Sequence, residues 1–521
     1  MLLLPLLLAC APHHLDAPLS IAIEADHRVE VRGAQISAVD PAKPAVAATV
    51  LRADRVTAGF VDAHTHPEAL GRSLAELDLS DAATYADVLA RVRAASAGEA
   101  WLQGRGWDQN DWDDAPAGGW PLAADLDRVT GARPALLRRV DGHAVWANSA
   151  ALAAAGVTAT TPDPAGGKLV RDAAGVPTGV LIDAAMDLVR APAPSHKQRR
   201  AWLIAGLDRA AEVGLTGVHV MWVDDEGLAL YDELARADAL PLRVWLYLAP
   251  DGQGAERLLT SGPWLVGWMQ VVGLKAFADG ALGSRGALLT DDYSDAHGER
   301  GLAVEAPERL ADLATRALGA HAQLAVHAIG DAGVSATLDA FAAARSAHPD
   351  VDVPLRVEHA QVIRPDDLQR FNELHVIASM QPTHATSDMG WAEARLGPER
   401  VRWAYAWATV LDQGIPLAFG SDFPVEAPDP GLGMWSATTR MNLAGEPPGG
   451  WYPAERLTTE HAARAFTEGP ANAVNAGDHL GQLAPGYDAD LTLWRVEATP
   501  WGERWHAVGT VVGGRAAHAS E

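Results

Sequence analysis

Cysteine is almost missing from this chain of 521 residues, in which Cys10 is the only one. A single thiol cannot form an internal disulfide bond. Basic residues are also few, since 41 Lys and Arg stand against 67 Asp and Glu, for a formal net charge of −26. The sequence shows no basic run that could follow a phosphate backbone. We therefore expect no nucleic acid among the partners of this protein.

The apolar N-terminal run MLLLPLLLAC is too short to cross a bilayer and too apolar for an ordinary soluble start. Its last four residues, Leu7 to Cys10, resemble the lipobox of bacterial lipoproteins, in which the cysteine carries the lipid. This predicts a signal and linker over residues 1–18, lipidation at Cys10 and an exported protein anchored to a membrane. The alternative is a cytoplasmic protein, because no Lys or Arg precedes the run.

Two terminal regions have the alternating apolar and polar residues of half-buried strands, as in Val29 to Arg32. We expect residues 19–57 and 478–521 to form one small β-sandwich. Between them, short apolar runs alternate with Ala- and Leu-rich stretches, the pattern of βα units. The predicted fold is therefore α/β, a (β/α)8 TIM barrel over residues 58–477. Its predicted strands are 58–64, 134–140, 215–221, 270–277, 324–327, 355–359, 376–380 and 416–420.

A long segment, residues 68–132, separates the first two predicted strands. It contains Trp101, Trp107, Trp112 and Trp120 among Gly, Asp and Pro residues. We expect an inserted cap segment here, placed over the mouth of the barrel.

Residues that can bind a metal recur where the predicted strands end. His64 and His66 are spaced so that both side chains share one face of a strand, and two imidazoles on one face can chelate an ion. Four other predicted strands also carry a metal-binding or charged residue at or near their carboxyl ends. The carboxyl end of a TIM barrel is where active sites form. These four positions hold Lys275, His327, His359 and Asp422.

Each of these residues has a structural alternative when it is taken alone. A histidine can be a hydrogen-bonded core residue, Asp422 can cap a helix, and Lys275 can form a salt bridge at a strand end. Their joint position at the ends of five different strands favours a metal site instead.

Several motifs together resemble the YtcJ-like branch of the amidohydrolase superfamily, also called amidohydrolase family 3, over about residues 20 to 515. That resemblance implies a barrel with a terminal β-sandwich, and ligand positions at His64, His66, His327, His359 and Asp422. It also aligns Lys275 with a lysine that can carry CO2 as a carbamate bridging two ions. The motifs are residues 58–66, 275–285, 326–331, 358–361, 381–389 and 420–426.

The chemistry of such a site is hydrolytic. A divalent ion lowers the pKa of a bound water from 15.7 towards about 7 and polarises a carbonyl. Nitrogen ligands favour zinc, as one or two ions. Asp422 would be the catalytic residue, taking a proton from the attacking water and returning it to the leaving nitrogen.

Five further residues lie in matching motifs and are predicted to contact substrate. For His143 the alternative is to orient a metal ligand, and for Arg285 it is an internal salt bridge. His219 has the chemistry of a ligand, but we assign it a structural role because five protein ligands are already named. The five predicted substrate contacts are Trp107, His143, Asp279, Arg285 and His384.

The expected function is metal-dependent hydrolysis of a non-peptide carbon–nitrogen bond in a small molecule, such as an amide, an N-acyl or N-formyl amine or a cyclic amide. The alternatives are an ester or carbamate hydrolase, an isomerase on the same barrel, and an inactive exported binding lipoprotein. The segments after the last two strands offer no glycine-rich phosphate loop, which disfavours a sugar-phosphate enzyme. The sequence does not indicate the oligomeric state, and a homodimer is one possible assembly.

Overall fold

The computed structural model describes residues 19–43, 47, 49–98, 101–109, 112–114, 116, 120–139, 144–164 and 167–519. The chain divides into two compact units. One combines the described residues up to Leu70 with those from Leu203 onward, and the other is Gly71–Trp202. Within the described ranges, no helix combines the length and the apolar character needed to cross a membrane.

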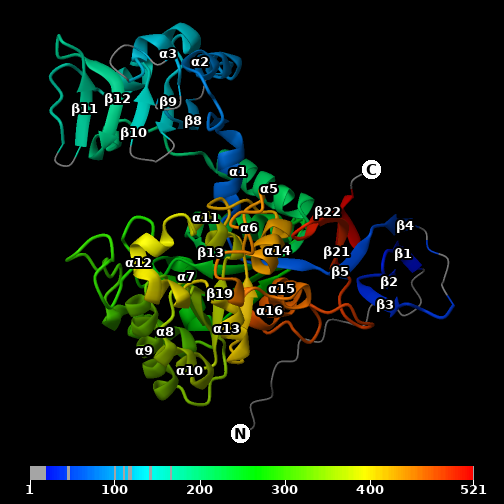
Figure 1. Ribbon diagram of the computed structural model, residues 1–521. Coiled ribbons are helices and arrows are strands. Elements are labelled where there is room, and N and C mark those ends of the chain that lie inside the picture. Colours follow the sequence, from blue (N-terminus) through cyan, green and yellow to red (C-terminus); the bar gives the residue numbers. More distant parts are fainter. Residues whose placement is uncertain are drawn as a thin grey trace. The chain divides into compact units, whose positions relative to one another are not determined.

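The larger unit contains a barrel of eight parallel strands (Figure 1). After β20 the chain returns to β6, where Asp422 N–H donates to the His64 carbonyl at 2.8 Å and His66 N–H to the Phe423 carbonyl at 3.0 Å. These bonds nearly close the barrel. In spatial order the strands are β6 (Phe60–Thr65), β13 (Leu215–Val223), β14 (Arg243–Leu248), β16 (Met269–Phe277), β17 (Gln323–Ala328), β18 (Leu355–His359), β19 (Val376–Met380) and β20 (Leu417–Phe419).

Helices follow the strands, as expected of βα units, and one short strand, β15 (Trp264–Val266), pairs antiparallel with β16. The helices before β20 are α5 (His196–Glu212), α6 (Asp225–Arg236), α7 (Gln253–Ser261), α8 (Pro307–Gly319), α9 (Asp331–Ala347), α10 (Pro365–Glu373), α11 (Pro382–Asp388), α12 (Ala392–Arg400), η2 (Val401–Trp403) and α13 (Trp407–Asp412). Those after β20 are α14 (Pro430–Thr439), η3 (Pro453–Glu455), α15 (Thr459–Phe466) and α16 (Glu468–Ala473).

The two termini form a sandwich beside the barrel. Both of its four-stranded sheets contribute to one apolar core, in which Ile23 and Val31 of the first sheet meet Leu491 and Val511 of the second. The first sheet has the order β3 (Gln35–Val39), β2 (Arg28–Arg32), β1 (Leu19–Glu24) and β4 (Thr49–Arg52), and the second β23 (Arg515–Ala519), β22 (Gly502–Val512), β21 (Leu491–Thr499) and β5 (Arg55–Ala58). The predicted barrel with a β-sandwich built from both termini is confirmed.

The inserted unit is larger than the predicted cap segment 68–132, because it extends to Trp202. Its sheet has the order β11 (Gly167–Arg171), β12 (Pro177–Asp183), β10 (Ala144–Ala147), β9 (Ala135–Arg139), β8 (Leu102–Trp107) and β7 (Leu77–Asp78). Its helices, in chain order, are α2 (Tyr85–Ala94), α3 (Ala123–Thr130), α4 (Ser149–Ala154) and η1 (Ala184–Leu188). The connecting helix α1 (Pro67–Ala75) begins in the larger unit.

One predicted barrel strand was wrong. The strand predicted over 134–140 corresponds to β9, which lies in the sheet of the inserted unit and not in the barrel. The missing barrel strand is β14, whose run Arg-Val-Trp-Leu-Tyr-Leu is buried between β13 and β16. Both segments are short apolar runs, and periodicity alone does not say which sheet such a run joins.

A polar layer lies inside the barrel, in contrast to the apolar contacts outside it. Tyr247 of β14 donates its hydroxyl to Gln323 Oε1 at 2.6 Å and accepts from Arg356 Nη1 at 2.8 Å. All three side chains are buried. The three residues belong to different strands, so this layer links β14, β17 and β18 inside the barrel.

Removing the Tyr247 hydroxyl takes away the hydrogen bond to Gln323 Oε1 and one of the two hydrogen bonds made by Arg356 Nη1. We expect Tyr247→Phe to lower the free energy of unfolding by about 1–3 kcal/mol. The control is Tyr231→Phe on α6, because the Tyr231 hydroxyl is buried with no hydrogen-bond partner among the described residues. Chemical denaturation should show that this second variant is as stable as the wild type or more so. Equal losses in both variants would contradict the account.

Candidate metal centre

Three side chains converge where the barrel closes. The Nε2 atoms of His64 and His66 lie 3.6 and 3.2 Å from Asp422 Oδ1. One ligand atom from each residue lies within 4.8 Å of the other two. Two imidazole nitrogens and one carboxylate oxygen at this spacing form a donor set for a divalent cation.

Asp62 holds the segment that carries Asp422. Its carboxylate accepts hydrogen bonds from Ser421 Oγ at 2.6 Å, from Ser421 N–H at 3.0 Å and from His64 N–H at 3.0 Å. A Cβ at Gly420 would lie 2.5 Å from Asp62 Oδ1, so this close approach requires glycine. Burial raises the pKa of Asp62 to about 7, and these hydrogen bonds oppose that rise.

The backbone is strained at two predicted ligands. His359 has a φ of 68° and Asp422 a φ of 61°, in the left-handed region that residues other than glycine rarely adopt. Such strain costs on the order of 1–3 kcal/mol and persists only where surrounding contacts hold it. Its occurrence at these two positions points to a functional geometry.

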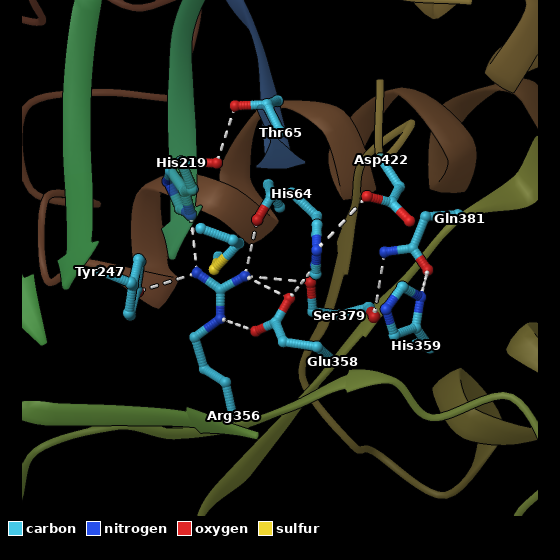
Figure 2. Close-up of polar contacts among 12 residues, drawn as sticks. His64, Thr65, His219, Tyr247, Arg356, Glu358, His359, Ser379, Gln381 and Asp422 are labelled. Carbon is cyan, nitrogen blue, oxygen red and sulfur yellow. Dashed lines mark hydrogen bonds and ion pairs between the residues drawn. The ribbon is translucent and has the colours of Figure 1, made fainter. Parts of the chain in front are cut away.

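Three of the histidines are anchored through Nδ1. In each of them the lone pair of Nε2 is therefore available to bind a cation. Each Nδ1 faces an oxygen that can only accept, which places the ring hydrogen on Nδ1. Figure 2 shows two of these contacts. The acceptors are Glu358 Oε2 for His64 at 2.7 Å, the Met221 carbonyl for His66 at 3.1 Å and Gln381 Oε1 for His359 at 2.8 Å.

The remaining predicted residues extend the cluster around His359. Its ring centroid lies 4.8 Å from that of His64, 4.5 Å from that of His327 and 5.9 Å from that of His384. Lys275 is buried, and its Nζ has no hydrogen-bond partner among the described residues. His327 Nε2 lies 3.4 Å from the Gly280 carbonyl, which leaves its Nδ1 as the free nitrogen.

Burial keeps the imidazoles of His64 and His327 uncharged at neutral pH. Desolvation, followed by the charge of Lys275, lowers the pKa of His64 to about 4 and that of His327 to about 3. Burial also lowers the pKa of Lys275 to about 8. For Asp422, burial alone would raise the pKa, but His64 and His66 lower it to about 2. Neutral imidazoles beside an ionised carboxylate are the forms that bind a cation, so the residues fit a divalent metal.

A buried ion pair that we did not anticipate from the sequence lies beneath the site (Figure 2). Arg356 Nε lies 2.8 Å from Glu358 Oε1, and Glu358 in turn accepts the Nδ1 hydrogen of His64. The other guanidinium nitrogens contact His219, Tyr247, Ser379 and the Ala63 carbonyl. The signal for this pair was present in the sequence, because two charged residues alternate along the buried strand β18.

The amidohydrolase family model matches residues 51–518. The chain belongs to the amidohydrolase family. Among curated relatives, the putative amidohydrolase YtcJ of Bacillus subtilis is 35% identical, over 84% of this chain and 83% of its own. An N-substituted formamide deformylase of Arthrobacter pascens is 28% identical, over 89% of this chain and 88% of its own.

Solved structures agree with this assignment. An uncharacterized metal-dependent hydrolase from Pyrococcus horikoshii has a TM-score of 0.74 at 25% identity, over 91% of this chain and 95% of that one. A metal-dependent hydrolase from Pyrococcus furiosus has a TM-score of 0.73 at 26% identity, over 91% and 97%. Together with the His64, His66 and Asp422 cluster, these findings make the protein a metal-dependent hydrolase of the amidohydrolase family.

Asp279 was predicted to contact substrate, but in this amidohydrolase its side chain binds backbone groups. Its buried carboxylate accepts hydrogen bonds from the backbone N–H groups of Leu288, Ile329 and Gly330 at 2.7 to 2.9 Å. These contacts tie together the segments after β16 and β17. Burial raises the pKa of Asp279 to about 7. The carboxylate oxygens are thus occupied by backbone N–H groups, and the substrate contact of Asp279 stays a prediction.

Two other predicted substrate contacts also differ in the structure. Arg285 forms a two-pronged ion pair with Asp295, at 3.1 and 2.9 Å, which is the alternative named for it. Trp107 is fully buried in the core of the inserted unit and donates its Nε1 hydrogen to the Leu137 carbonyl at 2.8 Å. His143 and Cys10 lie outside the described residues.

His219, for which we predicted a structural role, lies against the buried guanidinium of Arg356. Its Nδ1 lies 2.7 Å from Arg356 Nη1 and therefore accepts from the guanidinium. Burial, and then the charge of Arg356, holds the pKa of His219 well below its usual range. A ring nitrogen used in this way is not free to bind a cation.

Replacing Glu358 tests whether the buried pair positions His64. We expect Glu358→Gln to weaken binding of Zn²⁺ by about 10- to 100-fold, because the ring loses its charged acceptor. Competition with a chromophoric chelator measures the dissociation constant. The control is Glu460→Gln on the exposed first turn of α15. Unchanged affinity in the Glu358 variant would rule out a positioning role for that side chain.

Proposed function

We propose that this amidohydrolase cleaves a non-peptide carbon–nitrogen bond, with N-formyl and other N-acyl amines as its substrate class. The observation that carries the proposal is the convergence of two free imidazole nitrogens and an ionised carboxylate at His64, His66 and Asp422. The similarity to a deformylase of N-substituted formamides, over almost nine tenths of each chain, supports this bond class.

His64, His66 and Asp422 would hold the cation, and His327 and His359 complete the proposed ligand set. Nitrogen ligands favour zinc. A bound divalent cation supplies two effects, acidification of a coordinated water and polarisation of the scissile carbonyl. The protein contributes the orientation of the rings through their Nδ1 anchors.

Asp422 is proposed as the proton carrier. Its Oδ1 faces both histidines, which leaves Oδ2 as the oxygen to accept a proton from the attacking water. With a pKa of about 2 the carboxylate is ionised at neutral pH and able to accept that proton. The same oxygen can then return the proton to the leaving nitrogen.

His384 and Lys275 have proposed roles at the edge of this cluster. The His384 Nε2 is buried with no hydrogen-bond partner among the described residues, and a substrate carbonyl would satisfy it. The lowered pKa of Lys275 makes its neutral amine available, and that is the form that adds CO2 with loss of a proton. A carbamate at this position would add oxygen ligands for one or two ions.

A substrate panel tests the bond class. Zinc-loaded wild type should hydrolyse N-formyl or N-acetyl amines, and Asp422→Asn should lower kcat by about 10²- to 10⁴-fold, the contribution expected from general acid–base catalysis. Asp312→Asn, on the exposed face of α8, is the matched control and should retain activity. Hydrolysis of the matching esters without any amide turnover would refute the proposal and favour an ester hydrolase.

A further inference from the structure

An exposed tryptophan stands at the carboxyl end of β13, where its neighbours are buried. The Trp222 side chain is 44% exposed, whereas Met221 and Val223 are 1% and 6% exposed. Its φ of 60° lies in the left-handed region, which a bulky residue rarely adopts. Both features are costly, since they combine exposed apolar area with backbone strain.

A β-bulge is the cause of this geometry. Val220 pairs with Leu246 and Val223 with Leu248, so two residues of β13 stand opposite one residue of β14. The bulge has two effects. The Met221 carbonyl is directed at His66 Nδ1, at 3.1 Å, and the Trp222 side chain is turned out of the strand. The kink that orients a metal ligand therefore also places an indole at the rim of the barrel.

The Trp222 ring contacts the site through Phe277. The two ring centroids lie 5.0 Å apart with their planes at 62°. Phe277 ends β16, three residues beyond Leu274, which pairs with the last residue of β14, so the two rings meet past the end of the strand between them. The Phe277 centroid lies 5.4 Å from that of His327 and 5.1 Å from Lys275 Nζ.

The exposed fraction of the side chain decreases from Trp222 through Phe277 to His327. Trp222 is exposed, Phe277 is half-buried, and the His327 side chain is 14% exposed. The segment that hydrogen-bonds to the chain just after Phe277 adds two exposed apolar side chains, Leu302 and Val304. Exposed apolar side chains therefore lie on either side of Phe277, whose ring contacts His327 and Lys275 of the metal centre.

We propose that Trp222 and Phe277 form an aryl-binding subsite, which holds an aromatic group on the nitrogen of the substrate while the acyl carbon lies at the metal centre. This inference depends on the proposed function for the identity of the bond. Two rings in an edge-to-face pair accept a third ring in the same manner, and such ring contacts are favourable beyond the area they bury. A substrate ring would also cover the exposed part of Trp222.

The test compares N-(2-phenylethyl)formamide with N-ethylformamide, which differ by the phenyl group alone. In zinc-loaded protein, Trp222→Ala should lower kcat/KM for the phenyl substrate roughly tenfold, mainly through KM, and change the ethyl substrate by less than about twofold. Trp222→Phe should restore most of the loss. Trp403→Ala, which removes another exposed tryptophan, should change neither substrate.

A measurement without turnover separates the two proposals. Fluorine NMR gives the Kd of 2-(4-fluorophenyl)ethylamine, a fluorinated analogue of the product amine, and its binding should also weaken roughly tenfold in Trp222→Ala. Weakened amine binding in a protein that hydrolyses no formamide would support the subsite and overturn the bond class. Formamide turnover with an unchanged phenyl preference and an unchanged Kd would overturn the subsite and leave the bond class standing.

Discussion

The buried contact between Arg356, Glu358 and His64 is the interaction on which the metal centre depends. Glu358 has no exposed surface, and Arg356, followed by His64, lowers its pKa and so stabilises its charge there. Removing one member of such a pair typically costs about 3–5 kcal/mol, because the other charge stays buried alone. The guanidinium also links β18 to four other barrel strands, through Ala63, His219, Tyr247 and Ser379. The same side chain therefore supports the acceptor of a metal ligand and joins five strands of the barrel.

The metal centre is built as a set of anchored rings at the strand ends. Each anchor acts on the nitrogen remote from the cation, so a ring is oriented before any ion binds. The backbone adds a second constraint, because His359 and Asp422 are held in left-handed conformations by the hydrogen bonds around them. The bulge at Met221 and Trp222 is a further constraint of this kind. It directs the Met221 carbonyl at the ligand His66 and turns the Trp222 side chain outward. Strain and function coincide at these positions.

The sequence predicted the barrel, the terminal sandwich and the convergence of the histidines, because strand ends and residue spacing are local features. It failed where the answer depended on long-range pairing. The run predicted over 134–140 and the run that forms β14 both have the length and leucine content of a strand, and tertiary pairing decides that β9 joins the inserted unit and β14 the barrel. Trp107 and Asp279 lie in motifs that resemble pocket residues, yet one packs in a core and the other binds backbone amides. For the Arg356–Glu358 pair, the sequence indicated only that two charged residues lie on a strand predicted to be buried.

The most direct test of the account is the coupling of metal content to hydrolysis. Elemental mass spectrometry on protein purified without chelator, and again after dialysis against a chelator and readdition of Zn²⁺, gives the ion equivalents beside the rate of amide cleavage. The account predicts one or two ions per chain, on the pattern of this site type, with a rate that falls and returns in step with them. His64→Ala should bind less metal at every stage. Full hydrolytic activity in folded protein stripped of metal would contradict the central claim.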